Sequence, residues 1–315
     1  MNYKYSTEEA VICYLKNHQL TQLDEFEKVN FKEFFDENNP ANIYFILSKK
    51  RIAINPHYID FSDTYIELEF NILDKSKIEK LRLRIEHYYL GLKEMKIFSN
   101  YPYNYFEVKD EEGTTLSGGK TAYFLDAHYN KLKQPDSIDY EILYIGQSLD
   151  IHTSVPVIKR IKKYETFIKI LGDYSSNHPD KELFLLFASF VQDNTLEMLS
   201  SIPLSAEDEV ADVEKFKRLA SNPSKFTKKG RVTLVEGGLI NYFKPEYNEK
   251  FKHNFPSEDH VGYQECYDAD INTFILNLDV VAFRNKIYTS INDRKNYYEI
   301  KYNFQNSFDR RKMFE

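Results

Sequence analysis

The sequence has few cysteines and no tryptophan. Cys13 and Cys266 are the two cysteines among its 315 residues, which excludes a disulfide framework and a cysteine-based zinc site. So few cysteines are typical of a reducing compartment. No apolar run reaches the length of a membrane span, and the first residues lack the basic start and clean apolar stretch of a signal peptide. We therefore expect a cytoplasmic protein that does not interact with a membrane.

An excess of positive charge is also missing. The formal net charge is −7, which argues against a protein that coats nucleic acid non-specifically, because such binding places many Lys and Arg side chains on phosphates. A local basic groove on an acidic body is compatible with this charge. Aromatic residues are plentiful instead, with 25 tyrosines and 24 phenylalanines. They favour a core with polar outlets or surfaces that stack on flat ligands.

The chain divides into three segments by pattern. Residues 1–115 read as an α+β module of unknown role, and residues 256–315 read as a C-terminal β-strand extension. Between them, residues 116–255 carry the motifs that point to chemistry, with an insertion at about 193–230. The length of the chain is compatible with such a division.

Local patterns predict the following elements by periodicity and turn residues: a short helix within 1–30, two strands in 41–56 around a turn at Lys49 and Lys50, a strand at 64–73, a helix at 75–98, a strand hairpin at 105–126, a strand at 141–148, a helix at 155–177, a strand at 181–191, helices at 206–221 and within 226–248, and a meander of strands from 270 onward.

The segment GTTLSGGKT (113–121) is similar to a phosphate-binding loop. That motif has four residues between its first glycine and the Gly-Lys pair, whereas five residues separate Gly113 from Gly119. The following residues, TAYFLD (121–126), read as a strand, so no helix N-terminus would hold a phosphate. A glycine hairpin turn explains this segment better than a nucleotide site.

The helix within 226–248 carries an acid on its apolar face. Glu236 shares that face with Leu239, Ile240 and Phe243, and Pro245 ends the helix. A buried carboxylate without a partner costs several kcal/mol. The partner is either an Arg or Lys side chain or a divalent cation, and Mg²⁺ commonly takes only one or two protein carboxylates. Asn248 follows the helix, where it is either a plain cap or a ligand-binding amide.

Two glycines directly follow this acid. Because glycine is costly inside a helix, Gly237 and Gly238 predict that something approaches the backbone closely there.

Basic residues gather on the helix predicted at 155–177. Arg160 and Tyr164 are four residues apart and therefore neighbours on the helix surface. Lys159, Lys162 and Lys163 lie on the same turns. By themselves these residues describe either an ordinary basic amphipathic helix or one side of a groove for phosphates.

Four pieces taken together resemble the GIY-YIG nuclease superfamily: LYIGQS (143–148), Arg160 with Tyr164, VEGGLINYF (235–243) and FKPEYN (243–248). The resemblance covers about residues 118–255 and is to a divergent member. It implies an α+β fold whose core is a small antiparallel sheet flanked by helices. The Gly-Ile-Tyr motif of the family is not present as such, and the best match is TAYFL (121–125). Tyr164 stands where the family has histidine.

The resemblance implies a metal-dependent phosphodiester hydrolase with these roles. Glu236 would hold Mg²⁺ or Mn²⁺, Arg160 would clamp a non-bridging phosphate oxygen, and Tyr123 or Tyr144 would accept or relay a proton. Tyr164 would orient the phosphate or the water, and Asn248 would support the metal. The nucleic-acid-binding residues expected around them are Gly146, Gln147, Ser148, Lys159, Lys162, Lys163, Lys228 and Lys229.

Two functions fit the sequence. The first is a DNA endonuclease, restriction- or defence-like, for which RNA is not excluded as a substrate. The second is a module of the same resemblance that has lost catalysis and binds nucleic acid or a protein. Arg160, Glu236 and Asn248 together favour the nuclease, because a binding scaffold has little need of an inward-facing acid. The missing Gly-Ile-Tyr motif and Tyr164 favour the second.

Overall fold

The computed structural model describes residues 6–87, 93–147, 165–198, 205–222, 226–255 and 273–303. Its centre is a sheet of eight strands in the order β13-β12-β9-β2-β10-β1-β11-β14. The strands are β1 (Thr7–Gln22), β2 (Ile43–Lys50), β9 (Tyr140–Gln147), β10 (Lys181–Met198), β11 (Thr273–Asp279), β12 (Ile287–Thr289), β13 (Asn292–Lys295) and β14 (Tyr297–Asn303). Neighbouring strands run antiparallel except in the pairs β1–β11 and β9–β12.

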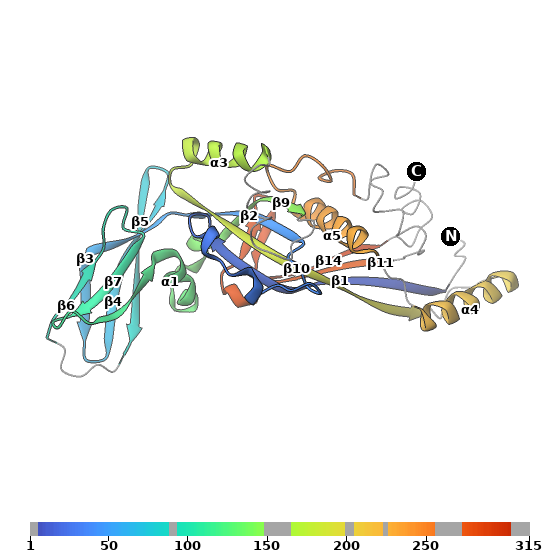
Figure 1. The fold of residues 1–315 in the computed structure, drawn as a ribbon, viewed down its shortest axis with the longest axis horizontal. Coiled ribbons are helices and arrows are strands. Elements are labelled where there is room, and N and C mark those ends of the chain that lie inside the picture. Colours follow the sequence, from blue (N-terminus) through green and yellow to red (C-terminus); the bar gives the residue numbers. More distant parts are fainter. Residues whose placement is uncertain are drawn as a thin grey trace.

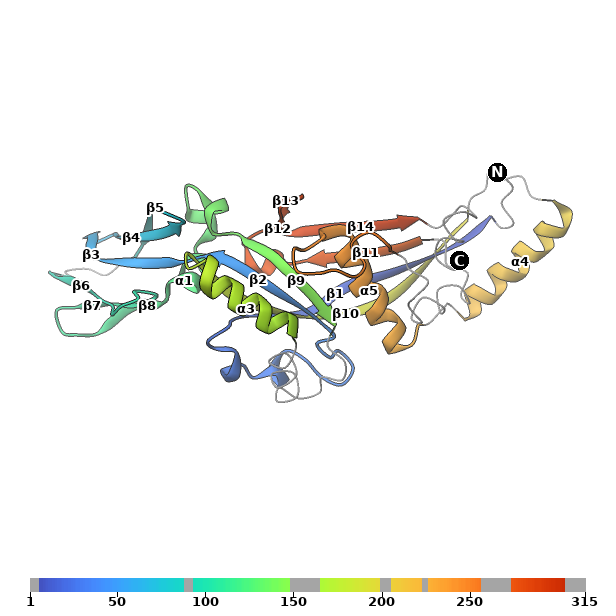
Figure 2. The ribbon, with the colours of Figure 1, turned by 90° about the horizontal axis from the view of Figure 1, so that it is seen from above.

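The middle of this sheet is covered on both faces. Seven successive residues of β2, from Ile43 to Lys49, are buried. Side chains alternate along a strand, so Phe45 packs into the core on one face and Ile46 into the core on the other. Helix α5 (Lys228–Phe243) covers the first face and α3 (Glu165–Asn177) the second. Figure 2 shows both helices alongside β2 and β9.

Two smaller sheets follow β2 in the chain and precede β9. One contains β3 (Ile52–Ser62), β4 (Tyr65–Asp74) and β5 (Lys77–Glu86), and the other contains β6 (Met95–Phe98), β7 (Tyr105–Asp110) and β8 (Thr115–Lys120). With α1 (Thr121–Ala127) they enclose a core of their own. This inserted unit, residues 51–139, lies at one end of the molecule, and α4 (Ala206–Ser221) lies at the other (Figure 1).

Buried polar contacts attach the inserted unit to the large sheet. Lys49 of β2 is fully buried and forms an ion pair with Asp126 of α1. The hydroxyl of Tyr140 donates to the same carboxylate at 2.5 Å. Burial is the main influence on the pKa of Lys49 and lowers it, while Asp126 opposes this effect.

Both helix ends of α5 have local causes. The side chain of Thr227 accepts a hydrogen bond from the backbone N–H of Gly230, which caps the first turn. At the other end, Lys244 adopts the left-handed conformation and Pro245 follows. The helix therefore stops where Pro245 predicts. No helix in the described ranges is both long enough and apolar enough to cross a membrane.

The expected fold class is wrong. Strands dominate the described residues, and the central sheet has eight strands rather than being a small sheet flanked by helices. The large sheet draws on all three expected segments: it takes β1 and β2 from residues 1–115, β9 and β10 from residues 116–255, and β11 to β14 from residues 256–315. The observed fold depends on strand pairing between residues that are far apart in the chain, and local sequence patterns do not predict such pairing.

Several local predictions are also wrong. The helix expected at 75–98 is replaced by β5 and β6, where buried Leu81 and Leu83 alternate with exposed Arg82 and Arg84. The segment 121–126 is helical rather than extended. Lys49 lies inside β2 and not at a turn. Residues 7–22 form the long strand β1 where a short helix was expected.

Candidate functional site

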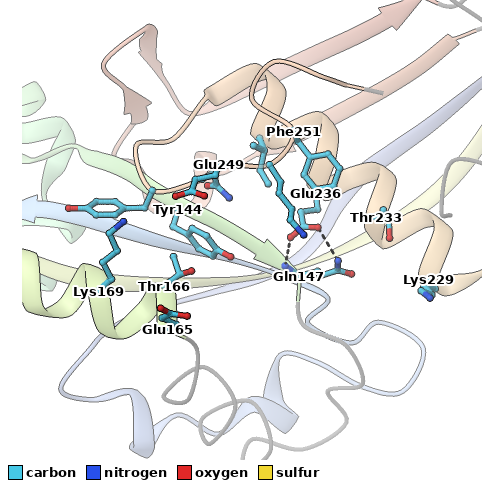
Figure 3. Close-up of a pocket in the computed structure, with 14 residues that line it drawn as sticks. Tyr144, Gln147, Glu165, Thr166, Lys169, Lys229, Thr233, Glu236, Glu249 and Phe251 are labelled. Carbon is cyan, nitrogen blue, oxygen red and sulfur yellow. Dashed lines mark hydrogen bonds between the residues drawn. The ribbon is translucent and has the colours of Figure 1, made fainter. Parts of the chain in front are cut away.

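A cavity of about 760 Å³ opens between α3, α5 and the end of β9 (Figure 3). Four parts of the chain line it: β9, the first turns of α3, the inner side of α5 and the loop after α5. The lining residues are Tyr144, Gln147, Glu165, Thr166, Lys169, Lys229, Thr233, Glu236, Ile240, Tyr247, Asn248, Glu249, Lys250 and Phe251.

Glu236 is the buried acid of this cavity. Its side chain belongs to the middle of α5, and the residue is only 7% exposed, as the sequence predicts. Both carboxylate oxygens accept hydrogen bonds from Gln147: the backbone N–H donates to Oε1 at 2.9 Å and the side-chain amide donates to Oε2 at 3.0 Å. Burial raises the pKa of Glu236 to about 7, and the hydrogen bonds from Gln147 and the charge of Lys250 oppose that rise. No buried Arg or Lys neutralises it in the part of the chain that the structure describes.

The position of Glu236 follows from an open strand edge. β12 pairs with β9 only at Tyr140 and Glu141, so the rest of that edge of β9 needs other partners. The backbone N–H of Tyr247 donates to the carbonyl of Leu143 at 3.1 Å. Beyond it, the side-chain amide of Asn248 hydrogen-bonds to the backbone of Ile145, and the carboxylate of Glu236 accepts a hydrogen bond from the backbone N–H of Gln147.

The side-chain amide of Asn248 takes the place of a neighbouring strand, because it hydrogen-bonds to the backbone of Ile145. Its Oδ1 accepts from the N–H of Ile145 at 2.9 Å, and its Nδ2 donates to the carbonyl of Ile145 at 2.8 Å. The amide is buried and both of its polar atoms are engaged with the backbone. The structure therefore gives Asn248 a positioning role beside Glu236, and the helix cap is Lys244 instead.

Tyr144 lines the same cavity, and a second tyrosine lies against it. Tyr44 of β2 pairs with Gly146 of β9, and the rings of Tyr44 and Tyr144 have centroids 5.9 Å apart. A Cβ atom at position 146 would lie 2.7 Å from Cζ of Tyr44 and 2.8 Å from Cε1 of Tyr144. The close approach expected at Gly146 does occur, and it is made by the rings of Tyr44 and Tyr144.

Sequence reasoning missed Tyr44. The signal was the Ile-Tyr pair in NIYF (42–45), inside an apolar run that predicts a strand. Tyr44 and Tyr144 are 100 positions apart in the chain, with the inserted unit between them, whereas pairing of β2 with β9 brings them together.

Tyr123 does not belong to the cavity. It lies on α1, where its ring packs against Phe184 and its hydroxyl accepts from the backbone N–H of Gln22 at 2.6 Å. Phe184 pairs with Leu47, near the end of β2 that leads to the inserted unit. Burial raises the pKa of Tyr123 to about 12. The expectation that Tyr123 acts beside Glu236 is wrong, because the two residues lie toward opposite ends of the strands.

The basic residues are only partly placed. Of the two lysines predicted on α5, Lys229 lines the cavity and Lys228 is exposed outside it. Lys169 and Lys250 also line the cavity, although the sequence analysis did not single them out. Glu165 and Glu249 also line the cavity, so its charge is mixed. The predicted residues Ser148, Lys159, Arg160, Lys162, Lys163 and Tyr164 lie outside the described residues.

Gly238 of α5 allows the helix to pack closely against the large sheet. A Cβ atom at Gly238 would lie 2.6 Å from Cδ1 of Leu276 on β11. The hydroxyl of Tyr302 on β14 donates to the carbonyl of Gly238 at 2.8 Å. The close approach that Gly237 and Gly238 predict is therefore made at Gly238 by the large sheet, which holds α5 and its acid against the sheet.

The cavity is compatible with one hard cation. No group of three or more His, Cys, Asp and Glu side chains suited to a metal occurs in the described ranges. Mg²⁺ needs fewer protein ligands, since it keeps several waters and takes substrate phosphate oxygens. Glu236 supplies a carboxylate at the cavity wall, and Thr233 lines the cavity one turn earlier on α5. These residues fit a cation held mainly by Glu236.

Comparison with known proteins gives no relative: no family model, no curated protein and no solved structure matches the chain significantly.

Proposed function

We propose that the protein is a divalent-metal-dependent endonuclease that hydrolyses DNA phosphodiester bonds, restriction- or defence-like. The observation that carries the proposal is the buried carboxylate of Glu236 at a cavity that also presents Tyr144 and three lysines. A buried acid without a cationic partner is costly to keep in a stable fold. A bound cation that completes the site would account for it.

The residues of the cavity suit the steps of phosphodiester hydrolysis. A bound Mg²⁺ or Mn²⁺ would supply Lewis-acid stabilisation of the phosphate and of the leaving oxygen. Glu236 would hold it, with Asn248 and Gln147 fixing the geometry of β9 around the acid. Lys169, Lys229 and Lys250 would attract the phosphate backbone. The hydroxyl of Tyr144 would relay the proton of the attacking water.

Two further roles rest on the sequence alone. We keep Arg160 as the phosphate clamp and Tyr164 as the residue that orients the phosphate or the water. Both precede α3, whose first residue, Glu165, lines the cavity.

We further infer a distant relationship to the GIY-YIG superfamily, on the basis of the resemblance in sequence. It rests on residues and not on the overall fold, because the large sheet differs from the expected core. Tyr44 and Tyr144 lie on adjacent antiparallel strands, with Glu236 on the helix that hydrogen-bonds to the end of β9. We assign Tyr44, in place of Tyr123, as the counterpart of the tyrosine in the first motif of the family.

The test is DNA cleavage with matched variants. Plasmid and linear DNA of mixed sequence are incubated with Mg²⁺ or Mn²⁺ and the wild-type protein, Glu236→Gln or Glu249→Gln. Glu249 is the matched control, because it lines the same cavity but is exposed. We expect metal-dependent cleavage that Glu236→Gln abolishes and Glu249→Gln largely retains. DNA binding without cleavage under all conditions would contradict the proposal and support a binding module that has lost catalysis.

A further inference from the structure

The side chain of Gln147 lies beside the carboxylate of Glu236. Its amide nitrogen is 3.0 Å from Oε2 of Glu236, while the backbone N–H of the same residue donates to Oε1 at 2.9 Å. Figure 3 shows both contacts as dashed lines at the cavity wall. One oxygen of Glu236 is thus bound to a fixed backbone group and the other to a group that can turn.

The two partners of Glu236 differ in freedom. The backbone of Gln147 is held by the pairing of β9 with β2, in which Gln147 is opposite Ile43. The side-chain amide, by contrast, is held by its hydrogen bond to Oε2 of Glu236 and can rotate about the bonds of its own side chain. A turn of half a revolution about its last bond exchanges the amide nitrogen and oxygen, which have almost the same shape. The same side chain can therefore offer a donor or a hard oxygen ligand at one place.

We propose that Gln147 is a second protein ligand of the cation, with its amide oxygen joining a carboxylate oxygen of Glu236. The inference rests on the proposed metal-dependent function. In the metal-free protein the amide donates to Oε2, and in the metal-bound protein it turns and presents its oxygen. The backbone N–H of Gln147 stays on Oε1 in both states and keeps the carboxylate in place.

The distance between the two groups fits a small cation. Mg²⁺ is octahedral with metal–oxygen distances of about 2.1 Å, which places adjacent ligand oxygens roughly 3.0 Å apart. The turned amide oxygen of Gln147 would take the place of a nitrogen that is 3.0 Å from Oε2. A cation of this size can therefore be held by the pair without movement of β9 or α5.

Binding of Mn²⁺ alone, measured by electron paramagnetic resonance of the free ion, tests the inference without reference to catalysis. We expect Gln147→Leu to weaken Mn²⁺ binding by about tenfold or more, the usual scale for support of a metal site. Gln147→Glu restores an oxygen and should bind Mn²⁺ at least as tightly as wild type. Gln134→Leu, the same change at an exposed glutamine, is the matched control and should leave binding unchanged. Thermal unfolding of each variant reports whether it is folded.

A crystal structure with Mn²⁺ gives the direct answer, which also covers a Gln147→Leu variant that does not fold. We expect the amide oxygen of Gln147 in the coordination sphere, at a bond length of about 2.2 Å or less. A bound ion with the amide nitrogen still directed at Glu236, or wild-type affinity in Gln147→Leu, would overturn the role of Gln147 and leave the nuclease proposal intact. Equal Mn²⁺ binding by wild type and Glu236→Gln would overturn both.

Discussion

Tyr44 occupies the space that a side chain at position 146 would need. Cζ of Tyr44 would be 2.7 Å from a Cβ atom at Gly146, and the contact joins adjacent strands that are far apart in the chain. Tyr44 itself is 2% exposed. The pair fixes β9 against β2 at the point where β9 delivers Tyr144 and Gln147 to the cavity.

Gly146→Ala should therefore destabilise the protein. The added methyl group has to displace the ring of Tyr44 or of Tyr144, and overpacking of this kind costs about 1–3 kcal/mol. Thermal or denaturant unfolding measures the loss. Gly172→Ala is the control, because nothing lies within 4 Å of a Cβ atom at that position in α3, and alanine favours the helix. Equal effects of the two substitutions would contradict the tight packing at Gly146.

Asn248→Leu should lower both stability and cleavage. The substitution keeps the approximate size but leaves the N–H and the carbonyl of Ile145 without their side-chain partners. Unsatisfied buried groups of this kind cost about 1–3 kcal/mol each. Denaturant unfolding and a plasmid cleavage assay measure the two effects. Normal cleavage by a variant with the expected loss of stability would show that the geometry of β9 at Ile145 does not matter for the reaction.

The two tyrosines named from the sequence should separate in a cleavage assay. Tyr144→Phe removes a hydroxyl from the cavity wall. We expect the rate of cleavage to fall by about a hundredfold or more, because proton-transfer groups usually contribute about 10²–10⁴-fold. Tyr123→Phe removes an acceptor from the N–H of Gln22, outside the cavity. It should cost about 1 kcal/mol of stability with the rate retained. The reverse pattern would place the reaction at α1.

The stability of the metal-free protein should depend on pH through Glu236. Its pKa in the folded protein is about 7, above the 4.5 of an ordinary glutamate, so the folded state keeps a proton that the unfolded state loses first. This contribution to the free energy of unfolding is complete below about pH 4.5 and is lost as the pH rises to about 7, by up to roughly 3 kcal/mol at 1.36 kcal/mol per pKa unit.

Denaturant unfolding across this pH range, with a chelator present, measures the effect. Glu236→Gln carries no titrating group and should flatten the dependence between pH 4.5 and 7, whereas Glu249→Gln, at an exposed position, should leave it unchanged. A wild-type curve that matches the Glu236→Gln curve would show that the carboxylate ionises normally in the folded protein.

The sequence predicted the surroundings of Glu236 better than the fold. The helix that bears Glu236, its end before Pro245 and the strand at Tyr144 all follow from local patterns, and the structure confirms them. Residues 75–98 show why other elements were missed. Lys, Arg, Glu and Leu favour helices in isolation, yet β5 pairs with β4 and its arginines contact Glu67 and Glu69.

The partner of Glu236 and the second tyrosine were beyond local reasoning for a related cause. Gln147 holds Glu236 across 89 positions of the chain, and Tyr44 meets Gly146 across the whole inserted unit. Neither spacing has a sequence signature. Pairing of β2 with β9 brings Tyr44 to Gly146, and the packing of α5 beside β9 brings Glu236 to Gln147.

The attachment of the inserted unit makes it a replaceable part. Ser48 and Glu141 are paired neighbours on β2 and β9, so the chain leaves and re-enters the large sheet at adjacent points that a short turn could join. The cavity lies toward the opposite ends of the same two strands, which lets residues 51–139 diverge or shrink during evolution without rebuilding it. The ion pair of Lys49 with Asp126 limits this freedom, since a chain that discards the unit also loses the carboxylate that neutralises Lys49.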